Sequence, residues 1–241
     1  MKNVIIFQDF VKNKGKYKKE ELFNFLRAQV DNSLRFGWKP NDIFICTNLD
    51  FRYENVNVVE MERICTYNRF FNRMYGLYEL LDKKIITENF WHHDFDDWQI
   101  NKFNFPKFDG DLAMTKFCDF QQLCVSEIFV KPSSLDIWNL FYDFAEVNRE
   151  HLEKNETLGD DAVLNLIYKN YPEIQSRFHQ LNSRYCVGCT QFEDRYNASQ
   201  LPIYIIAMKP NKDDITQFKN KNLIDKDLIS ILENNKLLIK R

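Results

Sequence analysis

The segment WHHDFDDW, residues 91–98, places two histidines and three aspartates between two tryptophans. We expect residues 85–94 to form a strand, in which side chains two positions apart share a face. Asp94 and Asp96 then project together where the strand ends. Paired carboxylates suit a hard cation such as Mg²⁺ or Mn²⁺, which keeps positions open for phosphate oxygens. The competing interpretation is a polar surface turn, because Asp-x-Asp occurs often by chance.

Zinc is the second metal to weigh, because histidines and cysteines are also present. The four histidines are residues 92, 93, 151 and 179, so none precedes the motif. Adjacent histidines on a strand face opposite ways, which disfavours one ion bound by both. The histidine–aspartate phosphohydrolase pattern needs an earlier histidine and is not met. A site from Cys186-x-x-Cys189 with Cys118 and Cys124 is conceivable, although VGCTQF lacks the character of a zinc knuckle.

Strands and helices alternate over the first hundred residues, which predicts an α/β domain with a largely parallel sheet. Apolar and β-branched runs predict strands at 4–7, 42–48, 56–61, 109–117, 126–132 and 202–210. Apolar residues at helical spacing predict helices at 20–37, 68–84, 133–152 and 160–171. The sequence after about residue 211 is polar with helical stretches. We therefore expect one domain, residues 1–210, and a C-terminal helical extension, residues 211–241.

Composition limits the classes of function. A net charge of -2 argues against a general nucleic-acid or membrane-surface binder, and 44% hydrophobic residues predict a globular core. No apolar segment approaches the roughly 20 residues that span a bilayer, and the N-terminal apolar run is too short for a signal peptide. Six scattered cysteines suit a reducing compartment. These features predict a cytoplasmic protein, in the host cell if the Lys, Asn, Phe and Ile richness marks a viral gene.

The order of the elements resembles that of the GT-A glycosyltransferases, the nucleotide-diphosphosugar transferases. The resemblance rests on a first strand, an early helix, the strand DIFICTN, the helix RFFNRMYGLYELL and a strand ending in Asp-x-Asp. It continues through DGDLAMTKF, SEIFVKPSSLDIWNLF, LGDDAVLNLIYKN and RFHQLNSRYCVG, over roughly residues 3–210. It implies a GT-A-like, Rossmann-like and mostly parallel central sheet flanked by helices.

The resemblance implies sugar transfer from a nucleotide-diphosphosugar, with UDP or GDP as the expected carrier. Asp94 and Asp96 would hold Mn²⁺ or Mg²⁺ against the donor diphosphate, with Asp97 helping through water. Many such enzymes supply a further histidine ligand from a late strand. The corresponding segment here, IYIIAMKPN, has Met208, a poor ligand for a hard cation. Water or Asp97 would then complete the metal shell.

The resemblance also implies where the donor nucleotide lies. Its nucleoside would contact the ends of the first two strands, at Phe7, Gln8, Asp9, Thr47 and Asn48. Arg69 and Arg73, on the helix before the acidic motif, could reach phosphate or belong to a solvated helix face.

The acceptor side is described by fewer residues. Asp160 and Asp161 are candidates for acceptor contact or general base, although acids also stabilise the helix that they open. Trp91 and Trp98 either offer platforms for a sugar ring or base, or pack as core aromatics. A basic loop could meet an anionic acceptor such as nucleic acid, or simply be solvated; a glycan acceptor is equally open. Its lysines are residues 12, 14, 16, 18 and 19.

Two other functions compete with the transferase. A catalytically silent sugar-nucleotide-binding module is favoured by the missing histidine, and donor hydrolysis without acceptor would distinguish it. A nucleotidyltransferase uses a similar sheet and paired acids but brings a glycine-rich loop after the first strand. That loop contains Gly15 alone here, which disfavours this third function.

Overall fold

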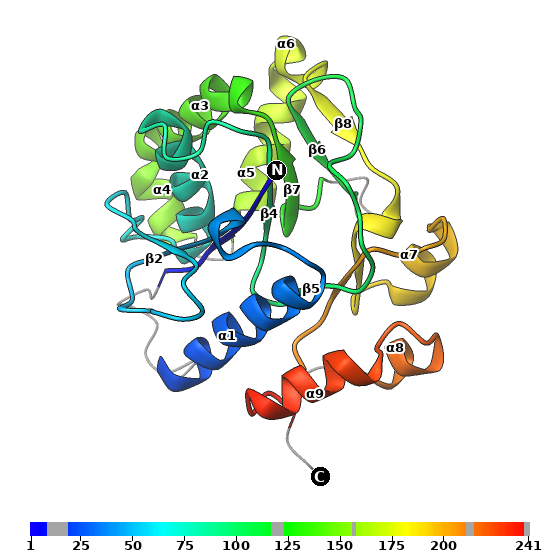
Figure 1. The fold of residues 1–241 in the computed structure, drawn as a ribbon. Coiled ribbons are helices and arrows are strands. Elements are labelled where there is room, and N and C mark those ends of the chain that lie inside the picture. Colours follow the sequence, from blue (N-terminus) through cyan, green and yellow to red (C-terminus); the bar gives the residue numbers. More distant parts are fainter. Residues whose placement is uncertain (9–18, 117–122, 156–157, 211–214, 239–241) are drawn as a thin grey trace.

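A seven-stranded sheet forms the centre of the fold, in the order β3-β2-β1-β4-β7-β6-β8 (Figure 1). The computed structural model describes residues 1–8, 19–116, 123–155, 158–210 and 215–238. The strands are β1 (Lys2–Ile6), β2 (Ile43–Thr47), β3 (Asn57–Glu60), β4 (Phe90–His93), β6 (Leu112–Met114), β7 (Glu127–Val130) and β8 (Phe178–Gln180). The pairs among β3, β2, β1 and β4 are parallel, β7 runs antiparallel to β4 and β6, and β8 is parallel to β6. The predicted mostly parallel sheet is confirmed.

Helices cover both faces of this sheet, because successive residues of its strands point apolar side chains to opposite faces. Val4 and Ile6 of β1 belong to the large core under α2, α3 and α5, whereas Ile5 joins the smaller core under α1. The helices are α1 (Lys19–Arg35), α2 (Asn72–Asp82), α3 (Leu135–Val147), α4 (Arg149–Lys154), α5 (Asp160–Asn170), α6 (Pro172–Gln175), α7 (Phe192–Ala198), α8 (Thr216–Asn220) and α9 (Lys226–Asn234). The predicted α/β class, with helices flanking the sheet, is therefore confirmed.

A second, three-stranded sheet has the order β5-β10-β9. Its strands are β5 (Asp97–Gln99), β9 (Val187–Gly188) and β10 (Ile205–Ala207), with β10 antiparallel to β5 and parallel to β9. The backbone amide of Met208 donates to the carbonyl of Asp96 at 2.9 Å. This sheet therefore brings β10 and Met208 beside the acidic motif.

Most predicted elements are shorter in the structure, and two of these differences change the interpretation. The strand predicted at 85–94 is confined to Phe90–His93, and Asp94–Asp96 form a turn, closed by the Asp97 amide donating to the Asp94 carbonyl at 3.2 Å. Strand periodicity therefore does not orient Asp94 and Asp96, because neither is in a strand. The helix predicted at 133–152 is divided between α3 and α4 at Asn148.

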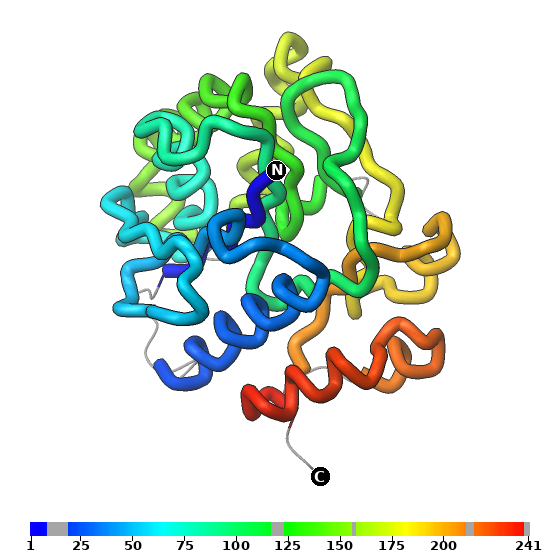
Figure 2. The backbone as a smooth tube through the Cα atoms, in the orientation of Figure 1, coloured from blue at the N-terminus to red at the C-terminus, as the bar shows by residue number. Residues whose placement is uncertain are grey.

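The C-terminal helices pack beside α1, as the red and blue segments show in Figure 2. Leu228 and Leu232 of α9 share a hydrophobic core with Phe25 and Ala28 of α1. Arg35 also forms an ion pair of 2.7 Å with Asp225, immediately before α9. Among the residues that the structure describes, no helix is both long and apolar enough to cross a membrane.

Candidate functional site

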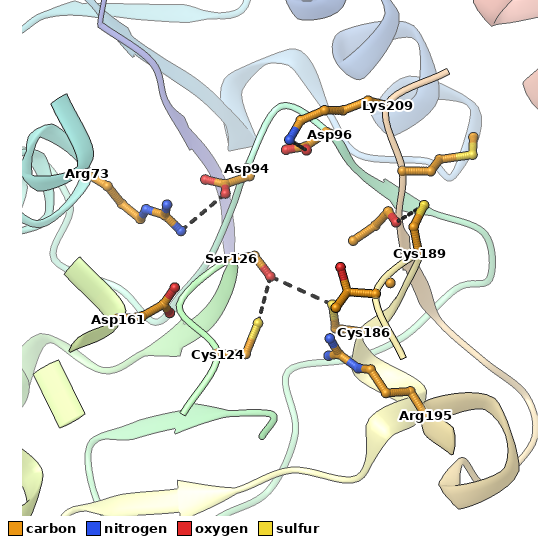
Figure 3. A pocket seen from close by; sticks show the side chains of 14 residues that line it. Arg73, Asp94, Asp96, Cys124, Ser126, Asp161, Cys186, Cys189, Arg195 and Lys209 are labelled. Carbon is orange, nitrogen blue, oxygen red and sulfur yellow. Dashed lines mark hydrogen bonds and ion pairs between the residues drawn. The ribbon is translucent and has the colours of Figure 1, made fainter. Parts of the chain in front are cut away.

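A cavity of about 280 Å³ opens beside the turn that follows β4 (Figure 3). From β1 the chain passes to β2 and β3 on one side and to β4 on the other, so the edge between β1 and β4 is a topological switch point. Ligands of open α/β sheets bind outside the carboxyl ends of strands at such points. The lining residues are Arg73, Asp94, Asp96, Cys124, Ser126, Asp161, Cys186, Gly188, Cys189, Thr190, Arg195, Ala207, Met208 and Lys209.

One side of the cavity, here called the carboxylate wall, consists of Asp94, Asp96 and Asp161 with Arg73 and Lys209. The Arg73 guanidinium forms an ion pair of 3.2 Å with Asp94. Lys209, which follows β10, forms one of 3.1 Å with Asp96. Each of the two aspartates of the motif therefore already has a cationic partner from a different part of the chain.

Arg73 also organises the start of α5. Its Nε lies 3.0 Å from Oδ2 of Asp160, whose side chain is buried, and its Nη1 donates to the Val125 carbonyl at 2.5 Å. Asp161 lines the cavity, and its Oδ1 accepts from the Val125 amide at 3.0 Å. The predicted pair thus separates: Asp160 holds Arg73, whereas Asp161 faces the cavity.

Crowding of acids makes this wall sensitive to pH. Burial raises the pKa of Asp94 to about 8, against the opposing charge of Arg73 and together with Asp96, Asp160 and Asp161. Burial likewise raises the pKa of Asp160 to about 6, opposed by Arg73. The pKa of Asp161 is raised by burial too. A metal ion bound at this wall, in addition to Arg73 and Lys209, would favour the ionised forms of these carboxyls.

The motif places carboxylate oxygens, the ligand type that a hard divalent cation prefers, at and beside the cavity. Asp94 and Asp96 both line the cavity, which confirms that they face one space although the turn sets their direction. Asp97 is buried, and its Oδ2 accepts from the Asp94 amide at 3.2 Å. Its Oδ1 has no hydrogen-bond partner among the described residues. Such an orphaned buried oxygen is the kind of group that a nearby cation or water satisfies.

A second part of the cavity lining, here called the thiol wall, has Cys124, Ser126, Cys186 and Arg195 at its surface (Figure 3). Glu127 is buried behind it. The Ser126 hydroxyl lies 3.1 Å from the Cys124 sulfur and 3.7 Å from the Cys186 sulfur. It donates to Glu127 Oε2 at 2.6 Å.

The other Glu127 oxygen accepts from Thr115 at 2.5 Å, and Thr115 accepts from Arg195 at 3.1 Å. The hydrogen bond from Cys186 lowers the pKa of Cys124 to about 6, helped by Arg195 and opposed by burial. Burial raises the pKa of Glu127 to about 8. Near neutral pH these pKa values favour the ionised form of Cys124 and the protonated form of Glu127, beside Arg195.

Sequence reasoning missed most of the thiol wall. It weighed Cys124 and Cys186 only together with Cys189 and with Cys118, which lies outside the described residues. The structure instead groups Cys124 and Cys186 with Glu127, their ligand atoms all within 4.8 Å of one another. Cys189 contacts the Ala207 carbonyl at 3.4 Å. Two distant segments meet here, so no local sequence pattern predicts the group.

The residues predicted to hold the nucleoside lie at the same edge of the sheet but do not line the cavity. The amide of Phe7 donates to the Cys46 carbonyl at 2.8 Å, so the ends of β1 and β2 are adjacent. Gln8 and Thr47 are buried, Asn48 is exposed, and Asp9 lies outside the described residues.

Of the two predicted arginines, only Arg73 reaches the cavity. The Arg69 guanidinium lies over the Phe70 ring at 4.7 Å.

The two tryptophans do not offer faces to a sugar. Trp91 is 1% exposed and stacks on His93 with ring centroids 4.0 Å apart. Trp98 is 0% exposed and donates to the Met208 carbonyl at 3.0 Å. Both are core aromatics in this structure, which corrects the expectation of a sugar platform.

The two histidines of the motif are also core residues. Both are buried, and burial lowers the pKa of His93 to about 3 and that of His92 well below its usual value. Both nitrogens of His93 have protein partners, the Asp94 carbonyl at 2.9 Å and Asn3 Oδ1 at 2.8 Å. His93 therefore keeps no ring nitrogen available for a metal.

Comparison with solved structures identifies the fold. The structure superposes on the galactosyltransferase LgtC, represented by an active-site mutant, with a TM-score of 0.60, 11% identity and 95% of both chains covered. A glycosyltransferase involved in glycosylation of the major capsid of PBCV-1 gives 0.54, at 10% identity over 92% of this chain and 98% of that one. Mouse xyloside xylosyltransferase 1 gives 0.50, at 11% identity over 88% and 99%.

The chain therefore has the GT-A fold that glycosyltransferases share, as its sequence predicts. No protein-family model and no curated protein sequence matches the chain. At 10–11% identity the likeness is one of backbone architecture, so function is argued from the cavity.

Proposed function

We propose that this protein is a glycosyltransferase that binds a nucleotide-diphosphosugar, with UDP or GDP as the carrier, at the carboxylate wall. The observation that carries the proposal is the convergence of Asp94, Asp96, Arg73 and Lys209 on one cavity at the switch point of a GT-A sheet. A diphosphate is a dense anion, and this wall offers two cationic side chains together with carboxylates for a divalent ion. The similar structures, which include LgtC in complex with donor and acceptor sugar analogues, agree with this class.

Asp94 and Asp96 would hold Mn²⁺ or Mg²⁺, with Asp97 as a helper through water. Mg²⁺ is commonly held by one or two carboxylates and completed by substrate phosphates and water, so two ligands suffice. When bound, the ion would neutralise charge on the departing diphosphate. Arg73 and Lys209 would shift part of their pairing from the aspartates to phosphate oxygens, because both already lie in the cavity.

In the transfer step, an acceptor hydroxyl oxygen bonds to the anomeric carbon. The bond from that carbon to the diphosphate oxygen breaks, and the nucleoside diphosphate leaves with the electron pair. The hydroxyl proton passes to a carboxylate, and Asp161 is the candidate because it faces the cavity. Asp160 acts through Arg73, to which it is bound, as a positioning residue.

Donor binding and donor hydrolysis together test this proposal. UDP- and GDP-sugars with Mn²⁺ should raise the melting temperature of the wild-type protein, and one of them should release nucleoside diphosphate slowly without an acceptor. Asp94→Asn should abolish both effects. Asp143→Asn, an exposed aspartate on α3 outside the cavity lining, is the matched control and should behave as wild type. The proposal fails if no sugar nucleotide produces a shift or if Asp94→Asn responds as the control does.

One observation favours the alternative of a catalytically silent sugar-nucleotide-binding module. Both motif aspartates are already paired with protein cations, which lowers the need for a metal. A silent module would show a donor-induced shift with no hydrolysis in any metal, whereas a transferase would show both.

A further inference from the structure

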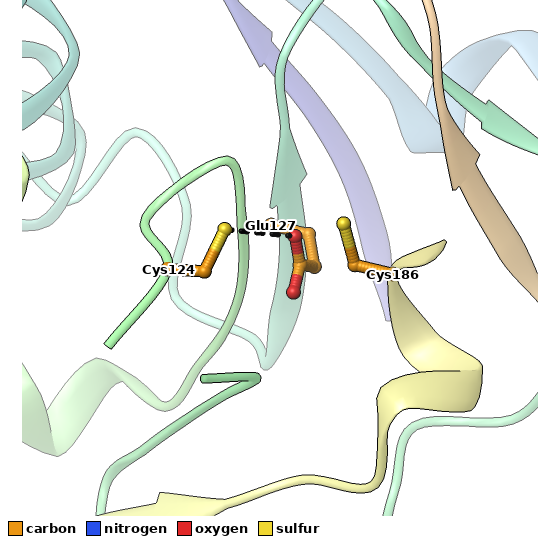
Figure 4. A group of neighbouring side chains, drawn as sticks. All are labelled: Cys124, Glu127 and Cys186. Atoms are coloured by element: carbon orange, nitrogen blue, oxygen red, sulfur yellow. Dashed lines mark hydrogen bonds between the residues drawn. The ribbon is translucent and has the colours of Figure 1, made fainter. Parts of the chain in front are cut away.

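The thiol wall contains a cluster that the proposed sugar transfer does not use. Cys124, Cys186 and Glu127 each point one potential ligand atom at a common space, and all three atoms lie within 4.8 Å of one another (Figure 4). Glu127 stands between the two cysteines, and its Oε2 is 4.0 Å from the Cys124 sulfur. Cys124 and Glu127 come from the segment entering β7, whereas Cys186 precedes β9.

We propose that Cys124, Cys186 and Glu127 form a second metal site, suited to Zn²⁺ or a similar thiophilic cation, in a part of the cavity separate from the Asp94 and Asp96 carboxylates. Two sulfur ligands select a soft or borderline ion, whereas the all-oxygen carboxylate wall selects Mg²⁺ or Mn²⁺. The cavity would therefore hold two ions of different chemistry on its two walls.

The spacing of the ligands is close to that of a zinc site. With Zn–S bonds of about 2.3 Å in tetrahedral geometry, two thiolate sulfurs lie roughly 3.8 Å apart. The observed limit of 4.8 Å exceeds that by about 1 Å, which side-chain rotation about the cysteine Cα–Cβ bonds can supply. A large backbone movement is not needed.

The residues around the cluster orient its carboxylate. Thr115 and Ser126 each donate to a different oxygen of Glu127, at 2.5 Å and 2.6 Å. Hydrogen bonds of this kind fix the direction of a metal-ligating carboxylate. On metal binding, the Ser126 hydroxyl, which now contacts both sulfurs, would turn toward the metal or give way to it.

Charge and access are also consistent with a metal. Zn²⁺ with two thiolates and one carboxylate carries one net negative charge, which the buried Arg195 beside the cluster offsets. Binding would release the protons that the thiols and the carboxyl hold beforehand. Cys124 and Cys186 both line the cavity, so the ion has an entry path and a fourth position open to water or an anionic ligand. Three protein ligands with one open position are the arrangement of reactive rather than purely structural zinc sites.

Cobalt and zinc binding to the reduced full-length protein tests this site. Co²⁺ should produce sulfur-to-metal charge-transfer absorption, saturating at one equivalent, and Zn²⁺ should remove it. Cys124→Ser and Cys186→Ser should each weaken Zn²⁺ binding by more than about 10-fold, the loss caused even by removing an outer hydrogen-bond partner of a ligand. Cys189→Ser is the matched control, because this third cysteine lines the same cavity outside the cluster, and it should bind Zn²⁺ as wild type.

A measurement on the wild-type protein tests the site even if the cysteine variants fail to fold. Zn²⁺ should protect Cys124 and Cys186, but not Cys189, from alkylation as judged by peptide mapping. Asp94→Asn should retain Zn²⁺ binding whether or not the protein transfers sugars, so this result stands apart from the proposed function. Absence of the charge-transfer band, equal alkylation with and without Zn²⁺, or loss of binding in Cys189→Ser would each overturn the site.

Discussion

Each wall of the cavity combines acidic side chains with an arginine, but the two walls arrange these groups differently. Both place an arginine beside acidic groups, Arg73 partly buried and Arg195 buried. In the carboxylate wall, Arg73 forms direct ion pairs with Asp94 and Asp160. In the thiol wall, Arg195 donates to the Thr115 hydroxyl, which donates to Glu127. Against the effect of burial, the nearby Cys186, Cys124 and Glu127 raise the pKa of Arg195. The acidic groups at the cavity surface are therefore carboxylates in the first wall and thiols in the second.

This difference indicates which ligands each wall can bind. Carboxylates paired at the surface can exchange a protein cation for a metal or release that cation to a diphosphate. Sulfur ligands in contact with the Ser126 hydroxyl discriminate strongly by the softness of the ion. One cavity thereby combines two groups of ligands with different metal preferences.

The largest expected effect comes from removing the arginine of the carboxylate wall. Arg73→Met should lower the free energy of unfolding by about 3–5 kcal/mol at pH 8, because it leaves buried acids without their counter-charge. The loss should shrink at pH 5, where Asp94 and Asp160, with pKa values of about 8 and 6, are protonated. Urea unfolding at both pH values measures this.

Arg52→Met provides the control for that experiment. The Arg52 side chain is 76% exposed and does not line the cavity, so its loss should cost about 1 kcal/mol or less. An equal loss in both variants, or a loss for Arg73→Met that does not change with pH, would contradict the assigned role of the ion pairs.

The next prediction compares the pH dependence of the two walls. Asp94 has a folded pKa of about 8, raised from about 3.9, so its stabilising contribution is complete below pH 4 and is lost as the pH rises through 8. Cys124 acts oppositely: its folded pKa of about 6 lies below about 8.5, so its contribution is present above the unfolded value and is lost as the pH falls through 6.

The free energy of unfolding measured from pH 5 to 9 should separate these contributions. Relative to wild type, Asp94→Asn should make the change with rising pH less negative, and Cys124→Ser should make it more negative. Asp143→Asn should parallel wild type. Shifts of the same sign in Asp94→Asn and Cys124→Ser would remove the electrostatic distinction between the walls.

The smallest expected effect on stability belongs to Lys209. Its side chain is 40% exposed, so Lys209→Ala should change the free energy of unfolding by less than about 1 kcal/mol. The same substitution should weaken sugar-nucleotide binding measured by calorimetry, because Lys209 is one of two cations on the carboxylate wall. A large loss of stability with unchanged donor affinity would show that this lysine is structural.

The fold and the carboxylate wall could be predicted because their signals are local. β-branched runs and helical spacing identified most of the central sheet and its main helices, but not the short strands β5, β8 and β9 or the helices α6 and α7. Asp94 and Asp96 stand two positions apart in the sequence. Their orientation could not be predicted from strand periodicity, because the chain turns after His93 to begin β5. Trp91 and Trp98 were ambiguous in sequence, since a buried and a ligand-facing aromatic residue look alike without the packing around them.

The thiol wall could not be predicted because pairing between distant segments creates it. Cys186 reaches Cys124 only after β9 joins β10 and β10 joins β5. Glu127 gave no signal at all, because it occupies a strand whose sequence indicates only a buried element. The division at residue 210 and the roles of the nucleoside-binding residues remain predictions.

The most direct measurement is a crossed titration of both ions and a sugar nucleotide. Wild type, Asp94→Asn and Cys124→Ser would each be titrated with Mn²⁺ plus the donor and, separately, with Zn²⁺. We expect Asp94→Asn to lose Mn²⁺-dependent donor binding and to keep Zn²⁺ binding. We expect Cys124→Ser to lose Zn²⁺ binding and to keep donor binding. If each folded variant loses both or neither, the cavity does not have two chemically distinct walls.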